Sequence, residues 1–162
     1  MPNRRTGLTP RLIAMAALGL LLSACVLVTD PNPLFDVTRD MSQNLRKWRD
    51  HGFTNYDYVV RNQCFCILGG VPVRVSVRDG QVVGVVYVSS GLPLESSLSS
   101  SYGDVELLFQ LINNAINARA ADIKATYDPA LGYPADVFID NIRNAADDES
   151  GFLVTSLTPV AR

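Results

Sequence analysis

Apolar residues recur along this chain with two different periods, and the change between them outlines its elements. The first apolar set has the three- and four-residue spacing of one helix face and comprises Val37, Met41, Leu45 and Trp48. Asp36 is placed to cap this helix and Gly52 to end it. A second helix is predicted from a set with the same spacing, which comprises Val105, Leu108, Phe109, Ile112, Ile116 and Ala120.

Other stretches alternate strictly between apolar and polar residues, which is typical of strands. Residues 55–63 and 71–78 alternate in this way, and Asp79-Gly80 is the preferred pair for a two-residue hairpin turn into residues 82–88. Because 82–88 is apolar on both sides, we expect it to be a central strand covered on both faces. Three further strands are predicted at 121–127, 135–140 and 152–158.

The predicted order is α-β-β-β-α-β-β-β, in which strands joined by hairpins are segregated from helices. This order indicates the α+β class. We expect an antiparallel sheet with the helices packed on one face and the other face partly exposed to water. The Ser-rich segment 89–101 is predicted to be a loop, either a simple connection or a lid over a binding site.

The first 24 residues follow the pattern of an export signal. Arg4, Arg5 and Arg11 precede an uncharged apolar run from Leu12 to Leu22. This run is too short to span a bilayer comfortably. The box Leu22-Ser23-Ala24-Cys25 resembles the bacterial lipoprotein signal at all four positions. That resemblance implies cleavage before Cys25 and acylation of its sulfur and new amine, with fatty acids such as palmitate. An ordinary signal peptide followed by a chance cysteine is the simpler alternative.

The lipoprotein interpretation divides the chain into a signal peptide at 1–24, a lipidated tether at 25–35 and one globular domain at 36–162. Residues 25–162 keep 11 basic and 16 acidic side chains, a net charge of −5, which argues against a nucleic-acid partner. The tether contains Pro31 and Pro33 and is short, so the domain should lie near a membrane. Val26 favours the outer membrane, facing the periplasm, if the source is Gram-negative.

Cys64 and Cys66 form a pair once Cys25 carries lipid, and the envelope is oxidising. Residues two apart in a strand are about 6.6 Å apart, whereas a disulfide brings the Cβ atoms to about 3.5–4.5 Å. A bond therefore requires the chain to leave strand geometry at this point, which the nearby Gly69-Gly70 favours. A structural disulfide is the first interpretation. A reduced buried pair, thiol exchange and a soft-metal site remain alternatives.

Four motifs occur together in this chain: Tyr56-x-Tyr58, Cys64-x-Cys66, Asp128-Pro129-x-x-Gly132-Tyr133-Pro134 and Asp147-Asp148-Glu149. In this combination they resemble a family of small bacterial secreted or lipid-anchored proteins known only as a domain of unknown function. The resemblance covers roughly residues 42–158. It implies the fold unit and the compartment, and it supplies no mechanism.

Motifs for catalysis are missing from the sequence. There is one histidine, no Gly-x-Ser-x-Gly and no Gly-rich phosphate loop, so we predict a protein that is not an enzyme and takes no cofactor. Acidic side chains could bind calcium, although their spacing does not match a calcium-binding loop. These acids are Asp128, Asp136, Asp140, Asp147, Asp148 and Glu149. A solvated acidic turn is the simpler interpretation, and we predict no metal.

The sequence thus predicts a lipid-anchored envelope protein that binds a protein or another envelope component. The possible binding surface comprises Tyr133, Asp140, Asp147, Asp148 and Glu149, together with the Ser-rich loop. A thiol-redox or soft-metal function of Cys64 and Cys66 is the alternative. The repeated helix-plus-strands order also suggests an inhibitor-like module that docks on an envelope enzyme. The cations of the first helix form either a solvated face or a contact with lipid headgroups.

Overall fold

The computed structural model describes residues 33–161. The predicted lipidation site Cys25 and the cleavage site before it lie outside the described residues. The described elements are, in chain order, α1 (Pro33–His51), β1 (Tyr56–Asn62), β2 (Val73–Arg78), β3 (Gln81–Tyr87), α2 (Ser96–Ser99), α3 (Val105–Ala118), β4 (Asp122–Tyr127), β5 (Pro134–Asp140) and β6 (Ser150–Pro159). Within 33–161, no helix is both long enough and apolar enough to cross a membrane.

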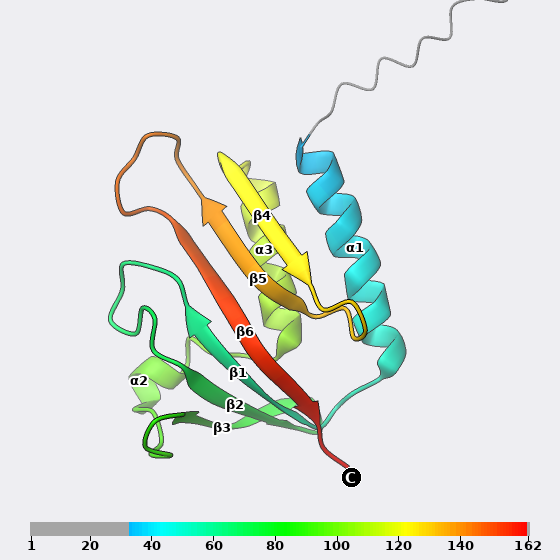
Figure 1. The fold of residues 1–162 in the computed structure, drawn as a ribbon, viewed down its shortest axis with the longest axis vertical. Helices are drawn as coiled ribbons and strands as arrows, with labels where there is room; N and C mark the ends of the chain where they lie inside the picture. The colour runs from blue at the N-terminus through cyan, green and yellow to red at the C-terminus, as the bar shows by residue number, and fades with distance from the viewer. Residues whose placement is uncertain (1–32, 162) are drawn as a thin grey trace, which may run out of the picture. The chain divides into compact units, whose positions relative to one another are not determined.

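The strands form one antiparallel sheet in the order β3-β2-β1-β6-β5-β4. Each half of the chain contributes three strands in succession, and the two halves meet where β1 pairs with β6. Figure 1 shows this sheet, with α1 and α3 running beside one another against it. The predicted α+β class and antiparallel sheet are confirmed, with the short α2 as an addition to the predicted order.

The core lies between one face of the sheet and the two long helices. Val73, Val75 and Val77 on β2 are completely buried, as the alternation along this strand predicts. They share the core with Tyr58 of β1 and Ile112 of α3. The alternate residues of β2 are polar and more exposed, and those of β1 are also more exposed, which leaves the opposite face of the sheet partly in water.

The prediction that residues 82–88 form a central strand is wrong, because β3 lies at the edge of the sheet. Its outer side is partly covered by the Ser-rich segment, where Tyr87 N donates to Leu92 O and Leu94 N donates to Val85 O, each at 2.9 Å. Val83 remains exposed. Strand β3 is therefore apolar on both sides because the Ser-rich segment partly covers this edge of the sheet, and not because β3 lies between two other strands.

Helix α1 begins at Pro33, earlier than a cap at Asp36 predicts, so residues 33–35 belong to the helix and not to the tether. A proline fits the first turn of a helix because its missing N–H has no partner there in any case. At the other end, Gly52 has a φ of +64° and its N–H donates to Arg49 O at 3.0 Å. The predicted helix end at Gly52 is therefore confirmed.

The Asp-Pro-x-x-Gly-Tyr-Pro motif forms a tight turn between β4 and β5. Asp128 Oδ1 accepts hydrogen bonds from Ala130 N and Leu131 N at 2.9 and 2.7 Å. The turn is fastened to α1, because Lys47 Nζ donates to Pro129 O at 2.6 Å. The motif therefore has a structural role, which is to hold the last turns of α1 against the sheet.

The sheet has two distinct ends. At one end, the last turns of α1 meet the β4–β5 turn. At the other end, the register places Asn62 opposite Phe152, and Ile139 opposite Ser150. Segments 63–72 and 141–149 therefore emerge at this second end, toward which the first turn of α1 also points (Figure 1). We call the first turn of α1 and these two segments the loop end.

Candidate functional site

The predicted binding surface is divided between the two ends of the sheet. Asp140 ends β5, and Asp147, Asp148 and Glu149 follow in segment 141–149 at the loop end. Tyr133 lies at the opposite end, where it is 8% exposed and packs edge-on against Trp48 with ring centroids 6.4 Å apart. The structure therefore places the four acids at one end of the sheet and Tyr133 in the core near the other end.

Asp148 gives segment 141–149 its shape. Its Oδ2 accepts a hydrogen bond from Ile142 N at 2.6 Å, and its backbone oxygen accepts one from Asn141 Nδ2, also at 2.6 Å. These bonds tie the two ends of the segment together across its bend. Asp148 thus acts as a structural brace, and the neighbouring Asp147 and Glu149 are exposed to solvent.

Cys64 and Cys66 form a disulfide in segment 63–72, with Cα atoms 5.3 Å apart. Strand β1 ends at Asn62, so the chain leaves strand geometry before the bond, as the spacing argument requires. Gly70 N then donates to Asn62 O at 2.8 Å and returns the chain toward β2. A side chain on Gly69 would meet the backbone oxygen of Cys64, which explains the glycine at this position.

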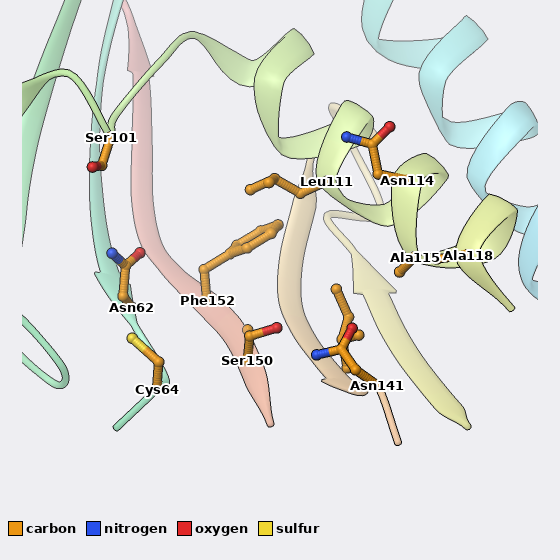
Figure 2. A pocket seen from close by; sticks show the side chains of 12 residues that line it. Asn62, Cys64, Ser101, Leu111, Asn114, Ala115, Ala118, Asn141, Ser150 and Phe152 are labelled. Carbon is orange, nitrogen blue, oxygen red and sulfur yellow. The ribbon is translucent and has the colours of Figure 1, made fainter. Parts of the chain in front are cut away.

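A cleft with a volume of about 420 Å³ opens between α3 and the ends of β1, β5 and β6. Figure 2 shows Leu111 of α3 beside the ring of Phe152 of β6, with the small side chains of Ala115 and Ala118 farther along the helix. The complete lining is Asn62, Cys64, Ser101, Leu111, Asn114, Ala115, Ala118, Ile139, Asn141, Ser150, Gly151 and Phe152. The rim therefore touches both segments of the loop end, through Cys64 and Asn141.

The cleft is electrically neutral. Its lining contains no Asp, Glu, Lys, Arg or His, and Cys64 does not titrate because it is in a disulfide. Apolar side chains are combined with the amides and hydroxyls of five Asn and Ser residues, which both donate and accept hydrogen bonds. This arrangement can hold an uncharged ligand with an apolar portion, and the side chains that line it supply no general acid or base.

Sequence reasoning missed this cleft because its residues are scattered over 91 positions, from Asn62 to Phe152, and belong to no common motif. The only residue of the cleft that the sequence pointed to was Cys64, through the spacing of Cys64 and Cys66. The acids of the predicted surface are absent from the lining. In the part of the chain that the structure describes, no group of three or more His, Cys, Asp and Glu residues could hold a metal ion.

The groups with shifted pKa values lie outside the cleft. Burial raises the pKa of Tyr56 to about 12, and it raises the pKa of Tyr58 and Tyr127 well above the usual range. A hydrogen bond from Arg78 lowers the pKa of the Asp57 carboxyl. Perturbed pKa values often mark catalytic groups, but here they accompany core tyrosines and an ion pair between neighbouring strands.

Two of the cations of α1 form ion pairs within the protein. Arg39 pairs with Asp36 at 3.0 Å and with Asp40 at 3.1 Å, and Arg49 pairs with Glu106 of α3 at 2.7 Å. Carboxylates therefore neutralise Arg39 and Arg49, whereas Lys47 donates to the backbone oxygen of Pro129 and keeps its charge.

Comparisons with known proteins give a family and no function. Searches of the curated proteins and of the solved structures found no match. A family model matches residues 40–159, a range that extends from α1 through all six strands to the last residue of β6. The chain therefore belongs to DUF6174, a family of unknown function, in agreement with the resemblance drawn from its motifs.

Proposed function

We propose that this protein is a lipid-anchored binding module of the cell envelope, without catalytic activity of its own. In this proposal Cys25 carries the lipid, and the cleft takes an uncharged, largely apolar segment of a partner protein. In a Gram-negative source the anchor would lie in the outer membrane, with the domain in the periplasm.

The neutrality of the cleft is the observation that carries this proposal. A cleft of about 420 Å³ is within the range of sites that hold small ligands or a few residues of a chain. Asn and Ser side chains match the alternating donors and acceptors of a peptide backbone, and Leu111, Ile139 and Phe152 offer apolar contact. General acid–base catalysis requires a titratable group within reach of the substrate, and the lining side chains include none.

A photo-crosslinking experiment tests the cleft. A benzophenone amino acid at Asn114, which lines the cleft, should give a discrete adduct in intact cells. The same group at Asn113, the exposed neighbour outside the lining, is the matched control and should give none. Ala118→Trp should fill the cleft and remove the adduct, whereas Asn113→Trp should leave it unchanged. Equal adducts from both positions would remove the cleft from the interface.

The anchor has its own test. Cys25→Ser should abolish incorporation of a labelled fatty acid, because the lipid is attached to this sulfur, and exchange of residues 1–25 for a cleavable secretory signal should release the domain from the membrane fraction. Labelling that persists in the variant would show that lipid is attached elsewhere, or that the membrane association has another cause.

Thiol exchange at Cys64–Cys66 is a second candidate function. Cys66 is exposed in segment 63–72, and exchange requires access of a thiolate to a sulfur atom. Titration against glutathione buffers separates the two functions. A bond that stays oxidised throughout the range of cellular glutathione potentials excludes exchange and leaves a structural disulfide.

A further inference from the structure

Large apolar side chains project from the loop end of the domain. Phe65 and Ile67 in segment 63–72 are 89% and 86% exposed, and Ile142 in segment 141–149 is 64% exposed. We call these three residues the apolar tips. Phe35, in the first turn of α1, is also 64% exposed. Phe65 and Ile67 are the most exposed large apolar side chains of the described residues, and exposed apolar side chains that lie close together mark an interaction surface.

Two of the apolar tips, Phe65 and Ile142, lie in braced segments of backbone. Phe65 lies inside the ring that the Cys64–Cys66 disulfide closes. Ile142 is fixed by the hydrogen bond from its N–H to Asp148 Oδ2 at 2.6 Å. Holding an apolar side chain in water gains nothing for folding, because its surface stays hydrated. The braces therefore indicate that these side chains are buried against something outside the domain.

The length of the tether indicates which surface buries the apolar tips, on the condition that Cys25 carries lipid as proposed above. Eight peptide units separate Cys25 from Pro33, and they can reach no further than roughly 28 Å. The first turn of α1 belongs to the loop end, so the tether joins the described domain, at Pro33, at the end that carries the apolar tips. A membrane within this reach is the nearest apolar phase.

The charge of the loop end limits the kind of membrane. Segment 141–149 has three acids, Asp147, Asp148 and Glu149, against one base, Arg143. An anionic lipid surface would repel this segment, whereas uncharged or zwitterionic headgroups would not. Arg39, the base nearest the start of α1, is already paired with Asp36 and Asp40. Attraction would therefore come from apolar insertion and not from charge.

We propose that the loop end docks on a lipid surface of net neutral headgroups, with Phe65, Ile67 and Ile142 inserted at the boundary between headgroups and acyl chains. Aromatic and large aliphatic side chains are the ones that enter this layer. The apolar tips project from two separate loops, a shape that suits a fluid layer better than the fixed pockets of a protein. Docking would turn the domain on its anchor and place the rim of the cleft at the membrane surface.

Tryptophan fluorescence tests the docking. The full-length lipidated protein with Phe65→Trp is reconstituted into phosphatidylcholine vesicles, with and without bromine on the acyl chains. Trp48 is the only natural tryptophan and is 4% exposed, so the unsubstituted protein supplies the background. We expect the introduced indole to shift its emission to the blue and to lose emission with brominated lipid. Ala130→Trp, at the opposite end of the sheet, should show neither change.

Each outcome of this experiment decides the proposal. Protein that floats with the vesicles but keeps its Phe65→Trp emission in brominated lipid overturns the docking and leaves the anchor in place. Protein that does not float overturns both. Quenching that is as strong in phosphatidylglycerol as in phosphatidylcholine overturns the preference for neutral headgroups. An indole that leaves water only when solubilised envelope proteins are added identifies a protein as the occupant and also overturns the docking on lipid.

Discussion

Tyr58 and Tyr56 show how single side chains fix the position of α3 on the sheet. Tyr58 Oη donates a hydrogen bond to Gly103 O at 2.5 Å, and Tyr56 Oη accepts one from Val105 N at 3.0 Å. Both rings are buried in the core, and their hydroxyls hold the residues with which the helix begins. Burial keeps both hydroxyls protonated, because it raises their pKa values above that of an exposed tyrosine.

This arrangement predicts a loss of stability in alkali. The contribution of Tyr58 is complete below about pH 10, the tyrosine pKa of the unfolded chain, and declines above it because only the unfolded state releases the proton. The expected slope is about 1.4 kcal/mol per pH unit for this group. Tyr58→Phe should be about 1 kcal/mol less stable at pH 8. Its stability should nevertheless fall less steeply, and urea unfolding from pH 8 to 12 measures both. Equal slopes in the two proteins would contradict this account.

Gly132 provides a second prediction at the level of a single residue. It has a φ of +83°, and a Cβ atom there would lie 2.7 Å from Asn44 O and 3.0 Å from Lys47 Cβ on α1. Gly132→Ala should therefore lower the free energy of unfolding by about 2–4 kcal/mol, through backbone strain and the clash together. Gly91→Ala is the control, because Gly91 also has a positive φ but open space around it. If both variants lost a similar amount of unfolding free energy, the close contact of Gly132 with α1 would not be the cause of the loss.

At the level of elements, the braced segment 63–72 should depend on its disulfide. The bond closes a ring of only three residues, so replacing Cys64 and Cys66 with serine should lower the free energy of unfolding by no more than about 1.6 kcal/mol. Hydrogen exchange should increase in 63–72 and remain unchanged in β1 and β2, because the bond lies outside both strands. Increased exchange throughout the sheet would show that the disulfide supports the whole fold.

The elements also show what the sequence could predict and what it could not. Periodicity found both long helices and all six strands, because the side-chain period depends only on the local chain. It misplaced β3, because the neighbours of a strand depend on pairings between distant residues such as Tyr58 and Leu157. The Cys64–Cys66 bond was accessible to reasoning because its constraint is local. The cleft was not, because the sheet and α3 must first bring Asn62 and Asn114 together.

At the scale of the whole molecule, the two three-strand halves meet at the β1–β6 pair (Figure 1). The cleft and the apolar tips lie at the end of this pair where Asn62 is opposite Phe152. The β4–β5 turn and the C-terminal turns of α1 stabilise the opposite end. The domain thus separates a tightly packed end from an end that presents both an open neutral cleft and exposed apolar side chains. Proposed lipidation at Cys25 would hold the second end near a membrane.

This division predicts that anchoring strengthens binding in the cleft. Exchange of residues 1–25 for a cleavable secretory signal would release the domain without lipid. An anchored domain meets a membrane-bound partner at a high effective concentration, so loss of the anchor should lower the adduct yield from Asn114 by about a hundredfold or more. The comparison requires equal amounts of folded protein, which near-UV circular dichroism of the purified chains can verify. An unchanged yield would mean that the partner is soluble, and that the cleft works independently of the membrane.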